Sequence, residues 1–172
     1  MVSALSREGL KRALRADPPL VEGVDEASQL QPNGIDVRVE RLARLVSAGT
    51  LGASDDARIP ASREECVPDA DGWWTLAPGP YVVTFRERVN LPKDLLALGR
   101  PRSSLVRSGV ALHGGVWDAG YSGTGEGLLS VLNPSGYRLQ RGARIMQLVF
   151  FLLDSTVDKG YAGRYQEGAT TT

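Results

Sequence analysis

The sequence has very little cysteine or histidine: its 172 residues include one of each, Cys66 and His113. A single cysteine excludes an internal disulfide framework and a cysteine-rich zinc site, so a reducing compartment is the default expectation. The single histidine leaves room for a Ser/His/Asp triad only if that triad uses His113. Its neighbours Gly114 and Gly115 are more typical of a loop than of a metal ligand.

An excess of either charge and a long apolar run are also missing. The 20 Lys and Arg residues balance the 20 Asp and Glu residues, so no global field draws the protein to nucleic acid or to an anionic membrane. No stretch approaches the ~18 apolar residues of a membrane span, and the N-terminus lacks the apolar core of a signal peptide. These absences predict a soluble, cytoplasmic protein with no nucleic-acid or membrane partner.

Several common site motifs are absent as well. The sequence contains no GxxxxGK[ST], no GxGxxG that opens a helix after a strand, and no HExxH. A P-loop, a dinucleotide fold and a zinc protease site are therefore excluded. Any phosphate recognition must come from local groups of arginine, serine and backbone N–H.

What is present is a pattern of short strands. Residues 35–40 alternate between apolar and polar side chains, which predicts a half-buried strand with Ile35, Val37 and Val39 on its inner face. The Pro-Gly-Pro at 78–80 predicts a turn between two short strands, and the glycines between Val116 and Asn133 predict a hairpin.

Helical signals are few. Ser6 followed by REGLKRAL predicts a capped helix within residues 1–20, and "DLLALG" predicts one or two helical turns near residues 93–107. Residues 48–72 are polar and broken by Gly and Pro, which predicts a long excursion with one short strand at its centre. We therefore expect one mostly β domain over residues 1–172, of the barrel or jelly-roll kind.

The chemical groups lie in the second half of the chain. Ser103 and Ser104 stand among arginines and could bind phosphate oxygens, or could simply begin a capped helix with solvated arginines. Asp118 could hold a water or a sugar hydroxyl, or could stabilise its own turn. Gln147 lies in an apolar strand and needs a partner if buried, or belongs to the polar face of an edge strand.

Five stretches in order resemble the motifs of one superfamily: "QPNGIDVRV", "PRSSLVRSGV", "VWDAGYSG", "NPSGYRLQRGARIMQLVF" and "YAGRYQ". Together they resemble the dUTPase and dCTP deaminase superfamily, most closely its archaeal-type dUTPase branch. The resemblance implies a distorted jelly-roll β-barrel and a homotrimer with active sites shared between subunits. It also implies hydrolysis of dUTP to dUMP and pyrophosphate, with Mg²⁺ held mainly by the triphosphate and not by a protein cage.

The resemblance also implies roles for individual residues. Asp118 matches the catalytic aspartate that contacts the 3′-hydroxyl and orients or deprotonates the attacking water, and Tyr121 matches the ring that excludes a ribose 2′-hydroxyl. The segment Leu128, Leu129 and Ser130 matches the backbone that reads the pyrimidine edge. The other implied substrate contacts are phosphate ligands, namely Arg102, Ser103, Ser104, Arg107 and Gln147, and residues of a mobile C-terminal arm (155–172), namely Tyr161, Arg164, Tyr165 and Gln166.

The branch of the superfamily depends on one carboxylate. The deaminases resembled here carry a glutamate three residues before the asparagine that corresponds to Asn133, and this sequence has Ser130 there. A serine hydroxyl with no partner base cannot take that role. Glu126 could still approach the base if the glycines around it fold differently. A dCTP deaminase or bifunctional enzyme, a non-catalytic regulatory trimer and a structural jelly roll therefore remain alternatives to the dUTPase hypothesis.

Overall fold

A computed structural model describes residues 3–168. The first two residues of the predicted N-terminal region and the last four of the predicted C-terminal arm, 169–172, lie outside the described part. The helices are α1 (Arg7–Leu14), α2 (Glu26–Gln29), α3 (Ser103–Arg107) and a 3₁₀ turn, η1 (Asp55–Ala57). The strands are β1 (Ser3–Ala4), β2 (Leu30–Gln31), β3 (Gly34–Leu45), β4 (Thr50–Leu51), β5 (Arg58–Ile59), β6 (Arg63–Glu65), β7 (Trp73–Leu76), β8 (Gly79–Asn90), β9 (Leu95–Pro101), β10 (Val110–His113), β11 (Ser122–Val131), β12 (Tyr137–Gln140), β13 (Arg144–Leu152) and β14 (Glu167–Gly168).

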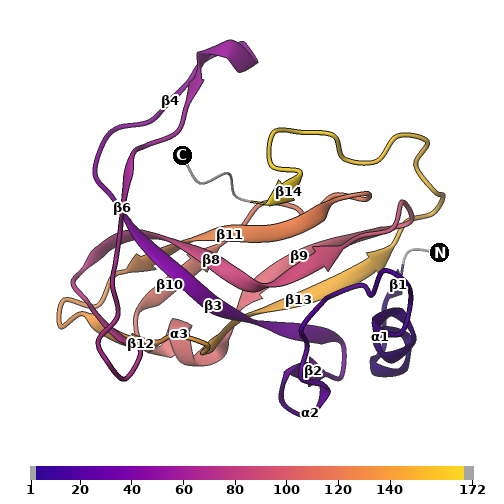
Figure 1. Ribbon diagram of the computed structural model, residues 1–172, viewed down its shortest axis with the longest axis horizontal. Coiled ribbons are helices and arrows are strands. Elements are labelled where there is room, and N and C mark those ends of the chain that lie inside the picture. Colours follow the sequence, from indigo (N-terminus) through magenta and orange to yellow (C-terminus); the bar gives the residue numbers. More distant parts are fainter. Residues whose placement is uncertain (1–2, 169–172) are drawn as a thin grey trace.

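One curled sheet dominates the described chain (Figure 1). Its main path runs β1-β13-β3-β8-β11-β10, while β12 with β7 and β4 with β5 form two small separate sheets. The long strand β3 links the two halves, because its beginning pairs with β13 and its end pairs with β8. The mostly β fold expected from the sequence is confirmed, in the form of a half-barrel that closes around an apolar core.

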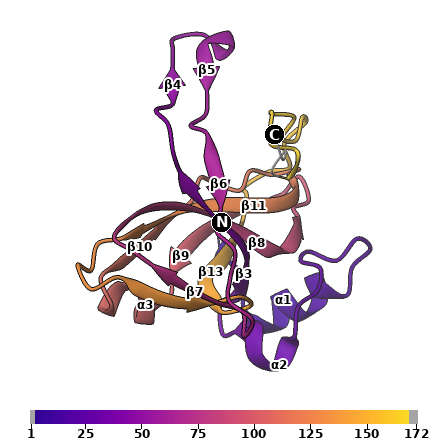
Figure 2. The same ribbon diagram turned by 60° about the vertical axis from the view of Figure 1, so that its left-hand side comes forward.

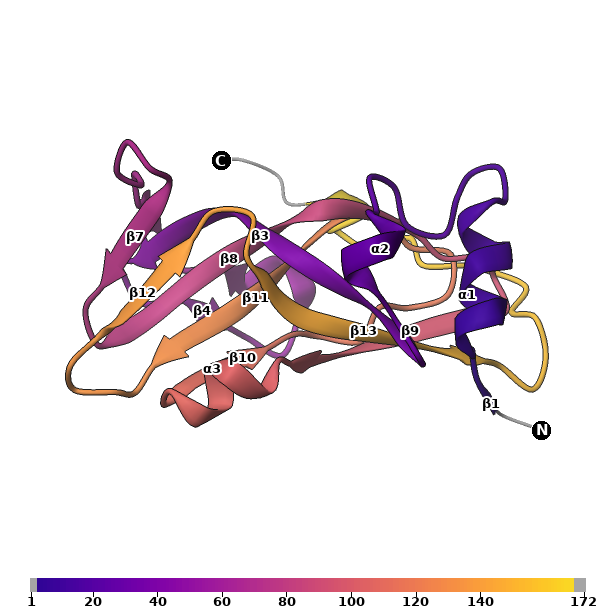
Figure 3. The ribbon, with the colours of Figure 1, turned by 90° about the horizontal axis from the view of Figure 1, so that it is seen from below.

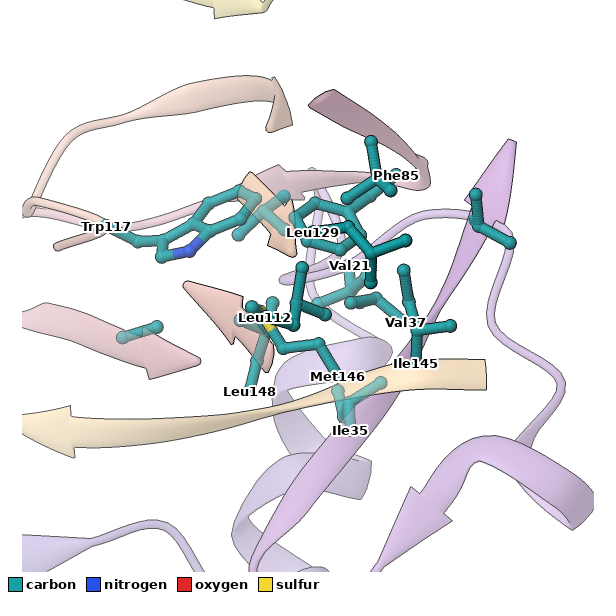
Figure 4. Packing of buried hydrophobic residues seen from close by; sticks show 14 of the residues in the cluster. Val21, Ile35, Val37, Phe85, Leu112, Trp117, Leu129, Ile145, Met146 and Leu148 are labelled. Carbon is teal, nitrogen blue, oxygen red and sulfur yellow. The ribbon is translucent and has the colours of Figure 1, made fainter. Parts of the chain in front are cut away.

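The core lies between the two halves of the sheet. Figure 4 shows Val37, Phe85 and Leu129 facing Ile145 and Leu148 across it, and none of these side chains is more than 1% exposed. Each such side chain contributes ~1.5–3 kcal/mol when it is fully buried. The sequence pattern that placed the inner face of β3 in this core is therefore correct.

The outer face of β3 differs from the expectation. Asp36 was expected on a solvated face, yet it is only 2% exposed. Its carboxylate accepts a hydrogen bond from Gln31 Nε2 at 3.1 Å and lies 3.3 Å from an Arg102 guanidinium nitrogen. The carboxylate is covered by Gln31 of the adjoining strand β2, by Arg102, which follows β9, and by Arg144 of β13, whose guanidinium nitrogen lies 3.6 Å away. The two arginines come from distant parts of the sequence.

Three other expectations are corrected. "DLLALG" is not helical: all of it after Asp94 belongs to β9, which pairs along its whole length with β13 and buries Leu95 and Ala97. The helical turns of this region are therefore confined to α3. The Pro-Gly-Pro turn does not join a hairpin, because β7 pairs with β12 while β8 pairs with β3 and β11. The stretch from Val116 to Asn133 is a loop followed by one strand, β11, and its hairpin partner is the preceding strand β10.

The N-terminal helix is confirmed: Ser6 caps α1 by accepting a hydrogen bond from Gly9 N–H at 3.3 Å. The short helix α2 was not predicted. It buries Gln29, whose Nε2 donates to the Asp36 carbonyl and to Glu87 Oε1, each at 2.8 Å. Glu87 is 1% exposed and also binds Arg38 Nε at 2.6 Å, so this network ties the N-terminal segment to the middle of the sheet.

The polar excursion at 48–72 contains more structure than its one expected strand. β4 and β5 pair with each other in a ribbon that projects from the body, and β6 returns to pair with the end of β3 (Figure 2). At the other end of the chain, β14 adds in parallel to Gly123 and Thr124 of β11, a part of β11 that β10 does not reach. Within residues 3–168, the helices are too short to cross a membrane.

Candidate functional site

An aromatic pocket of about 350 Å³ lies at the start of β11. Tyr121 forms its centre: the ring is 8% exposed and meets Trp117 edge-on at 5.4 Å and Tyr161 at 5.7 Å between centroids. Burial raises the pKa of the Tyr121 hydroxyl to about 12, with the Tyr161 hydroxyl acting in the same direction. The pocket therefore presents a neutral phenol and flat apolar surfaces at neutral pH, which suits a sugar or base better than a phosphate.

Asp118 lies at the mouth of this pocket. This residue is exposed in the single chain. Its position is nevertheless fixed, because the preceding residue Trp117 exchanges two backbone hydrogen bonds with Ala97 at 2.9 and 3.0 Å, and the Asp118 carbonyl accepts from Tyr121 N–H at 3.1 Å. The carboxylate can thus accept a hydrogen bond from a water or a hydroxyl while its backbone stays in place.

Glu126 lines the same pocket. It comes directly after an irregularity in the pairing of β11 with β8, where residues 85–87 of β8 lie opposite the single residue Gly125 of β11. Its side chain is 25% exposed and is held through Oε1, which accepts from Arg63 at 2.6 Å and from the Thr84 hydroxyl at 3.2 Å. Glu126 is therefore an anchored carboxylate of the pocket wall.

The C-terminal arm covers one side of the aromatic pocket. Tyr161 N–H donates to the Ala119 carbonyl at 2.8 Å, and Gln166 Nε2 donates to the Gly120 carbonyl at 3.1 Å. Gly120 has a φ of +85°, and a Cβ there would lie 2.6 Å from the Gly160 Cα, so the arm approaches only because this residue is glycine. Of the four predicted arm residues, Tyr161 and Tyr165 line the pocket, Gln166 anchors the arm, and Arg164 is exposed outside the lining.

A second, polar pocket of about 440 Å³ lies between β3, β9 and β13. It brings together Arg102, Ser103 and Gln147 of the predicted phosphate contacts, whereas Ser104 and Arg107 are exposed on α3 outside its lining. Asp36 also lines this pocket, which was not predicted from the sequence. Burial raises the pKa of Asp36, and the nearby guanidinium of Arg102 opposes that rise.

The predicted base-reading segment lies in the middle of β11. The Leu129 side chain belongs to the core, Leu128 is 39% exposed, and Ser130 is half-buried. All three residues are paired on both sides, with β10 on one and β8 on the other. The backbone groups of this segment are therefore already engaged within the sheet in the single chain.

The aromatic and polar pockets share no lining residue. One offers a carboxylate and aromatic rings, and the other offers guanidinium, hydroxyl and amide groups, so the features suited to a nucleoside and to a phosphate chain lie in different places. No group of three or more His, Cys, Asp or Glu residues within 3–168 is arranged to hold a metal ion. A cation bound here would need most of its oxygen ligands from a substrate or from water.

The curled sheet places the protein in the mostly β, jelly-roll class of folds, with its candidate site divided between two pockets. A model of the dCTP deaminase-like family matches residues 4–153, and the chain belongs to this family. The resemblance seen in the ordered motifs is thereby confirmed.

Relatives and a solved structure agree with this assignment. A probable deoxyuridine 5′-triphosphate nucleotidohydrolase of Methanosarcina mazei is 41% identical over 98% of this chain and 99% of its own length. A protein of the same name from Methanococcoides burtonii is 42% identical over 96% of this chain and 98% of its own. The crystal structure of 2′-deoxycytidine 5′-triphosphate deaminase from Agrobacterium tumefaciens superposes with a TM-score of 0.65 at 24% identity, covering 88% of this chain and 48% of that one, which supports the fold alone.

Proposed function

We propose that the protein is a dUTP diphosphatase that hydrolyses dUTP to dUMP and pyrophosphate. The observation that carries the proposal is that Asp118 and Tyr121 line the same pocket. In addition, the chain matches relatives named probable deoxyuridine 5′-triphosphate nucleotidohydrolase over almost its full length. The neutral Tyr121 ring packs against the deoxyribose and leaves no room for a 2′-hydroxyl.

In the proposed reaction a water held by the Asp118 carboxylate attacks the α-phosphorus in line with the leaving group. The new P–O bond forms as the bond from the α-phosphorus to the bridging oxygen breaks, and pyrophosphate leaves with that electron pair. Asp118 takes the proton of the water and returns it to solvent. Arg102, Ser103, Arg107 and Gln147 bind and orient the phosphates, and closure of the C-terminal arm excludes bulk water.

We propose Mg²⁺ as the cofactor. The donor set fits a metal held mainly by the triphosphate, since the carboxylates of the two pockets stand apart and form no protein cage. Bound in this way, the ion supplies charge neutralisation at the phosphate oxygens. The carboxylate of Asp36 in the polar pocket can accept hydrogen bonds from its waters.

We further propose a homotrimer with shared sites. The division of the nucleoside and phosphate features between two pockets of one chain supports this arrangement, because a second copy could bring its polar pocket to the aromatic pocket of the first. A closed ring of three copies would contain three such composite sites.

The alternative function is dCTP deamination, and one observation bears on it: Glu126 lies in the aromatic pocket. Its Oε1 is engaged by Arg63 and Thr84, which suits a positioned anion better than a proton shuttle, and Ser130 stands where the resemblance requires the glutamate of a deaminase. These two features favour the hydrolase.

The test is to incubate the purified protein with dUTP and separately with dCTP, each with Mg²⁺, and to measure pyrophosphate and the base of each product. We expect pyrophosphate and dUMP from dUTP, and no change in dCTP. Uracil nucleotides formed from dCTP would instead establish the deaminase, and binding of dUTP without turnover would establish a regulatory role.

A further inference from the structure

The projecting hairpin, residues 46–62, extends away from the half-barrel (Figures 1 and 2). Its two strands share only two residue pairs, Thr50 with Ile59 and Leu51 with Arg58. Leu51 is 79% exposed and Ile59 is 62% exposed. An isolated two-stranded ribbon is marginally stable in water at best, so a ribbon that displays its apolar side chains calls for a surface to pack against.

A matching surface exists elsewhere on the chain. The α3 groove, of about 310 Å³, lies between β9, α3 and β10. Its wall is mostly apolar, and it includes Val106 and Leu132, which are 59% and 70% exposed. Arg100 also lines it and is exposed, and within residues 3–168 it forms no ion pair. The hairpin tip carries an exposed acid, Asp56, whose charge is opposite to that of Arg100.

The hairpin cannot reach the groove of its own chain. In Figures 1 and 2 the hairpin leaves the body on the side opposite α3, and in Figure 3, seen from below, α3 lies in front while β4 lies behind the sheet. The occupant must therefore be a second copy. A contact between two different surfaces of identical chains propagates head to tail and closes into a ring when the rotation between copies allows it.

We propose that the projecting hairpin of one copy docks into the α3 groove of the next, and that this contact assembles the composite site; the inference rests on the proposed function. The base of the hairpin leads into Arg63, whose ion pair with Glu126 joins it to the aromatic pocket. The α3 groove shares Pro101 with the polar pocket. Docking would thus bring the hairpin of one copy, joined at its base to the aromatic pocket, next to the polar pocket of its neighbour.

The mass of the purified full-length protein in solution tests the contact. We expect a trimer for the wild type, and the dissociation constant of each hairpin–groove contact raised roughly 10- to 100-fold by Leu51→Asp or Ile59→Asp, the range set by the burial of one such side chain. Asp56→Arg and Arg100→Asp should each weaken the trimer, and the double variant should restore it. Because all four positions are exposed, the fold itself should be retained, which circular dichroism checks.

Val67→Asp is the matched control, because Val67 is 85% exposed and lies outside the hairpin. It should leave the trimer intact. The inference would be overturned by any of three results: the hairpin variants remain trimeric, the charge swap fails to restore the trimer, or Val67→Asp dissociates the trimer as strongly as the hairpin variants do.

The activity assay separates this inference from the proposed function. Hydrolysis of dUTP by a protein whose hairpin variants remain trimeric would refute the docking contact and leave the function standing. A trimer that depends on the hairpin but does not hydrolyse dUTP would refute the function and leave the contact standing.

Discussion

Replacing Gly125 by alanine should disturb the aromatic pocket directly, because the new methyl group would overlap the ring of Trp117. A Cβ at this position would lie 2.0 Å from Cη2 and 2.5 Å from Cζ2 of Trp117. Carbon atoms in contact prefer ~3.5–4.0 Å, so the ring would have to move by roughly 1.5 Å. Phe85 at 6.1 Å and Tyr121 at 5.4 Å between centroids, together with the backbone bonds to Ala97, leave it little room.

Overpacking of this kind costs about 1–3 kcal/mol. For a domain of this size the loss lowers the melting temperature by roughly 2–12 °C. Because Trp117 supports the ring of Tyr121, the KM for dUTP should rise as well. Thermal unfolding and steady-state kinetics measure the two effects.

Gly115→Ala is the matched control, since Gly115 lines the same pocket but has no atom within 4 Å of its would-be Cβ. It should leave both the melting temperature and the KM close to wild type. If Gly125→Ala behaves like Gly115→Ala, the packing of Trp117 on the β11 backbone is not what shapes the pocket.

The remaining predictions address catalysis, stability and pH. Asp118→Asn should lower kcat for dUTP by roughly 10²- to 10⁴-fold while calorimetric affinity changes little; unimpaired turnover would refute the water-holding role. Arg38→Met should cost about 3 kcal/mol in urea unfolding, because it leaves the buried carboxylate of Glu87 without its counter-charge. Tyr121 has an ordinary pKa of 10 when unfolded and about 12 when folded, so the folded state loses stability relative to Tyr121→Phe as pH rises from 10 to 12. That loss should approach about 3 kcal/mol; a constant difference between the two proteins across this range would contradict the burial of the hydroxyl.

Local sequence predicted those elements whose cause is local. The alternation at Ile35, Val37 and Val39 needs only the two-residue period of a strand, and the cap at Ser6 needs only the next few residues. By contrast, "DLLALG" has a helix-forming composition but becomes part of a strand because β13, about fifty residues later, offers a full set of backbone partners.

The site shows the same division. Asp118 and Tyr121 are three residues apart, so one motif was enough to predict that they share a pocket. Glu126 could not be placed from the sequence, because its anchors, Arg63 and Thr84, come from distant parts of the chain. The role of Asp36 in the polar pocket was missed because the two guanidinium groups beside it, those of Arg102 and Arg144, come from distant parts of the chain.

The short parallel strand β14 has a consequence for the solution behaviour of the protein. Beyond the end of β10, the edge of β11 at Gly123 and Thr124 would expose unpaired N–H and carbonyl groups if β14 did not lie along it. Such an edge is a template on which a strand from another molecule can add. Glu167 and Gly168 therefore protect this edge of the sheet. A protein shortened before Glu167 would expose the edge and self-associate through it.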